Sequence, residues 1–88
     1  MEVLLKPIEV VASFSKDGTL RPIRFRVITD DTGYETILVD CISRRRRERI
    51  GKVFIDIYTC LGKVMGREAP FELKYEISTG EWSLYRMG

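Results

Sequence analysis

Two strand-like runs that enclose a basic segment limit the possible folds of this chain more than any other feature. Residues 37–43 and 53–61 are rich in β-branched and aromatic side chains, and their apolar residues recur at every second position. That period belongs to a pleated strand, and not to a helix, which repeats after about 3.6 residues. Residues 44–52, between the runs, include six basic side chains and one acid. We therefore predict a long hairpin with a basic tip.

The register of this hairpin follows from placing the aliphatic side chains of both runs on one face. Odd-numbered positions must then pair with odd-numbered ones. Setting Cys41 opposite Thr59 and Ser43 opposite Ile57 leaves residues 48–52 as the loop. The reverse face would carry the pairs Ile42–Tyr58, Arg44–Asp56 and Arg46–Phe54. These are a packed pair, an ion pair and a cation–π pair.

Turn chemistry predicts another hairpin near the N-terminus. Asp17 and Gly18 favour a two-residue type I′ turn, in which both central residues have positive φ. Centring the turn there predicts the pairs Ala12–Ile23, Val10–Phe25 and Glu9–Arg26. The apolar faces of the two strands then coincide. Because Pro22 has no backbone N–H, we expect the second strand to be an edge or to be bulged near it.

A last hairpin is predicted at the C-terminal end of the chain. Apolar and charged side chains alternate over residues 71–77, which indicates a strand with one buried face. A two-residue turn at Thr79 and Gly80 sets Ile77 opposite Trp82. The apolar faces match again, so we expect Trp82 to lie in the core.

Together these patterns predict an all-β fold without a long helix. Residues 62–70 are glycine-rich and too short for a stable helix, so we expect a loop or crossover there. About six antiparallel strands in three hairpins then form a meander over a single domain, residues 1–88. The meander can roll into a small barrel or fold over as a two-layer sandwich, and the sequence leaves both closures open.

Composition favours a folded protein outside the membrane. Hydrophobic residues make up 44% of the chain and charged residues 32%, which is typical of a globular domain. A membrane helix needs about 20 consecutive apolar residues, and no apolar run approaches that length. The N-terminus also lacks the basic lead and apolar core of a signal peptide. We therefore expect a cytoplasmic protein with Cys41 and Cys60 reduced. The predicted register places them on opposite faces, which argues against a disulfide.

The basic cluster points most directly to a function. Arginine and lysine neutralise phosphates, and aromatic side chains beside basic ones bind single-stranded nucleic acid. The predicted nucleic-acid-binding residues are the cations Arg44, Arg45, Arg46, Arg47, Arg49 and Lys52, the aromatics Phe54 and Tyr58, and, if the second and third strands are neighbours, Arg24 and Arg26. The alternative is a solvated tip whose charges keep a strand edge from aggregating.

The apolar reverse face supports a second hypothesis. It would carry Ile28, Leu38, Ile42, Phe54 and Tyr58. In a sandwich these side chains are core, whereas in a closed barrel they are exposed and predict self-association or a protein partner. Nucleic-acid binding would weaken as salt rises, and apolar association would not.

The residues needed for catalysis or metal binding are scarce. The chain has no histidine, which removes the commonest general base and metal ligand. Cys41 and Cys60 lack the spacing of a zinc site, and no nucleophile stands beside a base. We therefore predict a binding module, not an enzyme, that holds neither a cofactor nor a metal.

Overall fold

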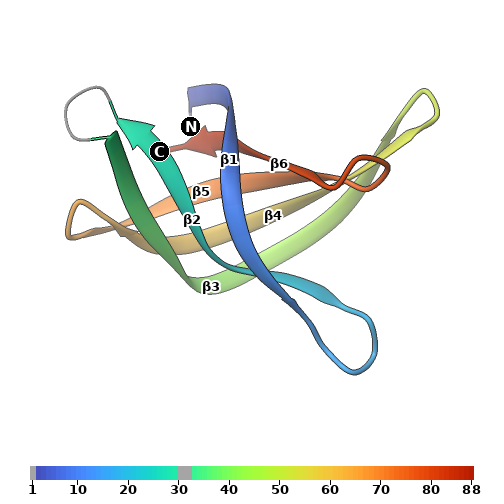
Figure 1. The fold of residues 1–88 in the computed structure, drawn as a ribbon, viewed down its shortest axis with the longest axis horizontal. Coiled ribbons are helices and arrows are strands. Elements are labelled where there is room, and N and C mark those ends of the chain that lie inside the picture. The colour runs from blue at the N-terminus through green and yellow to red at the C-terminus, as the bar shows by residue number, and fades with distance from the viewer. Residues whose placement is uncertain (1, 30–32) are drawn as a thin grey trace.

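The chain folds as six antiparallel strands, in a computed structural model that describes residues 2–29 and 33–88. The strands are β1 (Glu2–Phe14), β2 (Leu20–Thr29), β3 (Gly33–Ile50), β4 (Val53–Val64), β5 (Arg67–Glu76) and β6 (Glu81–Met87). Each strand pairs with the next, and β6 pairs with β1, so the sheet closes into a barrel (Figure 1). The described residues form no helix that could cross a membrane. The predicted all-β meander is confirmed, and its closure is the barrel.

The barrel interior is filled by side chains. Alternate residues of each strand point inward, and the buried core cluster consists of Phe25, Ile37, Tyr58, Cys60, Phe71, Leu73 and Leu84. Phe25 and Phe71 meet edge to face with ring centroids 5.2 Å apart. A small barrel packed in this way has no room for a ligand at its centre, so a functional site would lie on its outer faces or at its ends.

The β1–β2 hairpin keeps most of its predicted register. Two of the predicted pairs are present, Val10–Phe25 and Glu9–Arg26. A bulge between Val11 and Ala12 then sets Ala12 opposite Pro22, not opposite the predicted Ile23. The expectation that β2 is bulged near Pro22 is confirmed.

The turn of this hairpin differs from the predicted one. Its loop has three residues, 16–18, and only Gly18 among them has positive φ, at 84°. The Gly18 amide donates to the Ser15 carbonyl over 2.9 Å, which makes a type I turn followed by a left-handed glycine. Hydrogen bonds from the Ser15 hydroxyl and the Thr19 amide lower the pKa of Asp17 to about 2. Asp17 therefore stabilises the turn by accepting hydrogen bonds.

The β5–β6 hairpin is displaced by two residues from its predicted register. Tyr75, and not Ile77, lies opposite Trp82, because the loop has four residues, 77–80. The Gly80 amide closes it by donating to the Glu76 carbonyl over 2.9 Å. A shift of two residues keeps each side chain on its predicted face, so Trp82 still packs against the core, in contact with Tyr75 at 4.7 Å between ring centroids.

The β3–β4 hairpin has a different register from the predicted one. Its two-residue turn is Gly51–Lys52, with Gly51 at a φ of 62°, as in a type II′ turn. The pairs beside the turn are Arg49–Phe54, Arg47–Asp56 and Arg45–Tyr58. Each predicted partner is therefore displaced by three residues along β3. The turn sets this register, because two residues between Ile50 and Val53 pair odd-numbered residues of β3 with even-numbered residues of β4, whereas the predicted pairing was odd with odd. Farther from the tip, two bulges leave Asp40 and Ser43 without an opposite residue, and the parity changes at the first and returns at the second.

Residues 62–70, where the sequence predicts a loop or crossover, form the hairpin between β4 and β5. Met65 and Gly66 make its turn at φ of 52° and 78°, which fits a type I′ turn. The two strands stay in one register up to the pair Val64–Arg67. The meander therefore has five hairpin connections where the sequence predicts three hairpins.

The seam between β2 and β3 is partly open. The two strands pair from Thr29–Gly33 to Arg24–Leu38 and then separate. Among the described residues, β3 beyond Leu38 pairs with β4 alone. In Figure 1 the β1–β2 hairpin runs to the lower right while the β3–β4 hairpin runs to the upper right. The basic segment lies on the diverging part of β3.

Candidate nucleic-acid interface

The predicted site lies on the part of the β3–β4 hairpin that we call the basic arm, residues 44–59. Its side chains alternate between two faces. Arg45 pairs with Tyr58, which is 1% exposed and faces the barrel interior, so Arg45, Arg47 and Arg49 share the inner side. Arg44 and Arg46 lie on the outer side. The register thus divides the arginine run between two surfaces.

On the inner side, Arg47 is held by Asp56. The Arg47 Nε lies 2.7 Å from Asp56 Oδ1 and Nη2 lies 3.2 Å from Oδ2, a bidentate ion pair. The Asp56 side chain is buried, and its hydrogen bond and charge raise the pKa of Arg47. A buried carboxylate without this partner would be costly. Arg47 therefore has a structural role, and its charge is largely neutralised.

On the outer side, Arg46 is held by Glu48 of its own strand and by Glu72 of β5, across β4. Its Nη1 lies 3.3 Å from Glu72 Oε2, and its Nε lies 3.6 Å from Glu48 Oε2. Burial alone would raise the pKa of Glu72, but hydrogen bonds from Thr59 and Arg46 and the charges of Arg46 and Arg86 lower it overall. The Glu72 carboxylate is thus ionised, and Arg46 is one of the cations that neutralise it.

Four cations of the basic arm remain available to a ligand. Arg44, Arg45, Arg49 and Lys52 are exposed, and no acid of the described residues forms an ion pair with them. The Arg49 guanidinium lies over the Phe54 ring, 5.7 Å from its centroid, and Phe54 is 45% exposed. The arm therefore presents net positive charge beside an exposed aromatic face.

Tyr58, predicted as a stacking surface, is enclosed in the barrel. Tyr58 and Cys60 belong to the face of β4 that fills the barrel, and the predicted aliphatic face with Ile55 and Ile57 is not the core face. The Tyr58 hydroxyl donates to the Leu20 carbonyl over 2.8 Å. Burial, followed by the charge of Asp56, raises the pKa of Tyr58. A base cannot reach this ring, so Tyr58 leaves the candidate site.

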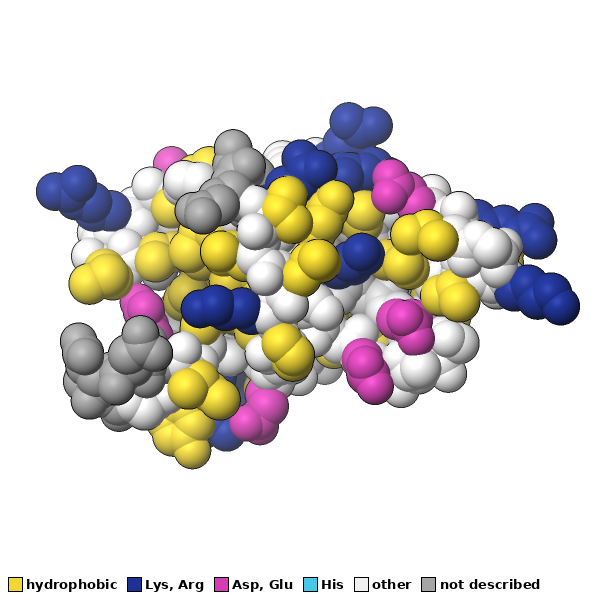
Figure 2. All heavy atoms as spheres, turned by 90° about the horizontal axis from the view of Figure 1, so that it is seen from above, with side chains coloured by type: hydrophobic (Ala, Val, Ile, Leu, Met, Phe, Trp, Pro, Cys, Tyr) yellow, Lys and Arg dark blue, Asp and Glu magenta, His cyan; other side chains and the backbone are white. Residues whose placement is uncertain are grey.

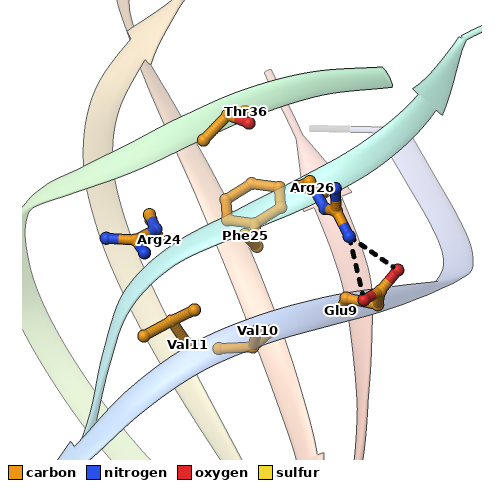
Figure 3. A pocket seen from close by; sticks show the side chains of 7 residues that line it. All are labelled: Glu9, Val10, Val11, Arg24, Phe25, Arg26 and Thr36. Carbon is orange, nitrogen blue, oxygen red and sulfur yellow. Dashed lines mark hydrogen bonds and ion pairs between the residues drawn. The ribbon is translucent and has the colours of Figure 1, made fainter. Parts of the chain in front are cut away.

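Arg24 and Arg26 lie on a separate surface. The condition for including them is met, because β2 and β3 are neighbours, but Arg24 is opposite Leu38, six residues before Arg44, or about 20 Å along the strand. They line a groove of about 370 Å³ across the outer face of β1–β3 (Figure 3). There Arg26 pairs with Glu9 at 3.2 Å and lies 4.5 Å from the centroid of the Tyr34 ring.

A hollow beside the basic arm was not predicted. It has a volume of about 460 Å³ and lies where the strands diverge at one end of the barrel. The β1–β2 side contributes Phe14 and Thr19, and the opposite side contributes Arg45, Arg47 and Tyr75. Phe14 is 70% exposed. The sequence pattern could not reveal this hollow, because it depends on the opening of the β2–β3 seam.

Basic side chains stand out at both ends of the long axis of the molecule (Figure 2). The tips of β3–β4 and β4–β5 occupy these opposite ends (Figure 1). Lys63, opposite Glu68, and Arg67, opposite Val64, lie close to the second tip and therefore far from the arm. Within the described residues no three His, Cys, Asp or Glu side chains are grouped as metal ligands. Comparisons with protein-family models, with curated proteins and with solved structures find no match.

Proposed function

We propose that the protein is a non-enzymatic module that binds single-stranded nucleic acid through the basic arm. The proposal rests on one observation, which is that some cations of the arm form ion pairs with acids and others do not. Arg46 and Arg47 form ion pairs with buried acids, whereas Arg44, Arg45, Arg49 and Lys52 are exposed and form no ion pair with an acid of the described residues. Such cations can neutralise phosphates and release their counter-ions.

Phe54 gives the proposed surface a preference for unpaired bases. Its ring is 45% exposed and lies beside Arg49. A base that stacks on an aromatic ring contributes about 1–3 kcal/mol irrespective of its identity. In a duplex the bases are paired and stacked on one another, so their faces cannot stack on Phe54. We therefore expect weak binding with a preference for single strands and little dependence on base sequence.

A titration of a fluorescent mixed-sequence oligonucleotide at about 50 mM salt tests the proposal, because ionic contacts are least screened there. Four phosphate contacts predict that log affinity falls with log salt at a slope of about −3. The matched control is Lys63→Gln/Arg67→Gln, which removes two charges at the opposite end and should leave the slope unchanged. Failure to bind at high micromolar protein would refute the proposal.

Protein interaction is the second candidate function, and the open edge of β3 favours it. Beyond Leu38 this edge has no neighbouring strand among the described residues. Apolar side chains are also exposed on the outer face nearby, including Ile28, Tyr34 and Leu38. The apolar-face hypothesis predicts association that resists salt, so the same salt series separates association through this face from nucleic-acid binding.

A further inference from the structure

The open edge of β3 is a place where another strand can add to the sheet. Seven residues, from Arg44 to Ile50, run without a bulge and pair with β4 on one side. On the other side, no described strand accompanies them. Seven residues span about 23 Å, which is the length of an ordinary strand. The edge can therefore accept a complete strand.

The backbone groups of Arg45, Arg47 and Arg49 face this open side. Alternate residues of an antiparallel strand direct their N–H and C=O groups towards opposite neighbours. The two-residue turn at Gly51–Lys52 makes Ile50–Val53 the first hydrogen-bonded pair, so Arg49 and each second residue before it point away from β4. Consistent with this, the Phe54 carbonyl opposite Arg49 accepts a hydrogen bond from the Ile77 amide at 3.1 Å.

The facing edge of β2 is a poorer template for an added strand. It carries Pro22, which has no N–H to donate, and a bulge interrupts its ladder with β1 at the same place. Hollows of about 360 and 460 Å³ separate β2 from β3 along the opened seam. An incoming strand therefore has space beside β3 and would hydrogen-bond to β3.

The positive charge along this edge determines which kind of strand can bind there. Three arginines, at positions 45, 47 and 49, line the inner side of the edge, and Asp56 neutralises one of them. A second copy pairing through the same segment would set arginine opposite arginine, which is destabilising. A strand with carboxylates at alternate positions would instead place them against these arginines.

We infer that the protein binds an extended acidic segment of a partner protein by strand addition to Arg44–Ile50 of β3. Main-chain hydrogen bonds supply affinity in this mode, and alternate side chains supply specificity. The inference goes beyond nucleic-acid binding, because it needs the backbone of β3 as well as the charge of its side chains.

The test uses a fluorescent synthetic peptide of seven residues in which glutamate alternates with valine or threonine. We expect binding, slower amide hydrogen exchange at Arg45, Arg47 and Arg49, and weaker binding when each glutamate is replaced by glutamine. Methylating the peptide nitrogens that face β3 keeps the charge but removes hydrogen bonds, so affinity should fall about tenfold or more. Because this change is in the peptide, the folding of the protein is unaffected.

Three results would overturn the inference: no binding of the acidic peptide, equal binding of its N-methylated form, or unchanged exchange at the three arginine amides. Oligonucleotide binding to the same protein is measured separately. If oligonucleotides bind but the peptide does not, the nucleic-acid proposal survives alone. If the peptide binds with the expected exchange protection and oligonucleotides do not, strand addition survives alone.

Discussion

The Tyr58 hydroxyl donates a hydrogen bond to the Leu20 carbonyl over 2.8 Å, joining β4 to β2 across the end of the barrel. Leu20 belongs to the part of β2 that has already separated from β3. A side chain of β4 therefore reaches β2 where β3 no longer pairs with it, although β1 still does through the pair Phe14–Leu20. The hydrogen bond spans the opening beside the basic arm.

We expect Tyr58→Phe to lower the free energy of unfolding by about 1–2 kcal/mol, since a carbonyl in a partly buried position loses its donor. Urea denaturation measures the change. The matched control is Tyr34→Phe, whose exposed ring keeps its face towards Arg26 and should change stability by less than about 0.5 kcal/mol. Equal effects of the two substitutions would show that the Tyr58–Leu20 bond contributes nothing.

Gly62 lies where the backbone of β3 leaves no room for a Cβ on β4. A Cβ on this residue would overlap the Leu38 carbonyl oxygen and lie 2.9 Å from Cε1 of Phe71. Gly62→Ala should therefore destabilise the protein by about 1–3 kcal/mol through overpacking. The neighbouring exposed Lys63→Ala is the comparison in the same denaturation assay. If Gly62→Ala left the free energy of unfolding unchanged, β3 and β4 could not approach each other so closely at Gly62.

The two cysteines should differ in reactivity. Cys41 is exposed, whereas Cys60 is completely buried and its pKa is raised to about 12, first by desolvation. A thiol reagent at about pH 8 should modify one cysteine quickly and the second only on unfolding, because the thiolate is the reactive form. Cys41→Ser should abolish the fast phase. Two fast phases in the native protein would contradict the inward position of Cys60.

Glu72 should make stability depend on acid pH. Its pKa is lowered from 4.5 in the folded protein, so the unfolded chain binds more protons as the solution becomes acidic. The stabilisation is present above the ordinary pKa and is lost as pH falls through the lowered value. Glu72→Gln should thus be more destabilising at about pH 7 than at about pH 3. Exposed Glu68→Gln is the control, and a Glu72→Gln effect that does not change with pH would contradict the ion-pair network.

Several features of the fold could be predicted from local sequence. Apolar alternation was enough to pair Val10 with Phe25, because a shift of one residue would expose the core face. The bulge beside Ala12 offsets the turn, which is one residue longer than predicted. The β5–β6 loop is longer than predicted, yet Trp82 keeps its face, since two residues restore the parity. In these two hairpins alternation identifies the buried face better than the turn does, but in β4 it predicts the wrong face, since Tyr58 and Cys60 and not Ile57 belong to the core cluster.

The basic arm shows where such inference fails. The two-residue turn at Gly51–Lys52 pairs odd-numbered with even-numbered residues, against the predicted alignment of the aliphatic faces, and the bulges at Asp40 and Ser43 have no clear mark in the sequence. Gly51 was an available signal, because a type II′ turn centred on it gives the observed pair Arg47–Asp56. Glu72 belongs to a later hairpin, so its ion pair with Arg46 forms only in the folded barrel. The sequence identified the cations of the arm, but not which of them form ion pairs with acids.

The most direct test of the proposed division of the arm compares two double variants that remove the same charge. Arg44→Gln/Arg49→Gln should flatten the salt dependence of oligonucleotide affinity by about 1.4 log units per log unit of salt, as expected for two lost contacts with a single strand, and should leave stability nearly unchanged. Arg46→Gln/Arg47→Gln should keep the salt slope but lower the free energy of unfolding by about 1–3 kcal/mol or more, because buried Glu72 and Asp56 lose partners. Equal flattening of the slope by both variants, with equal stability, would contradict the account.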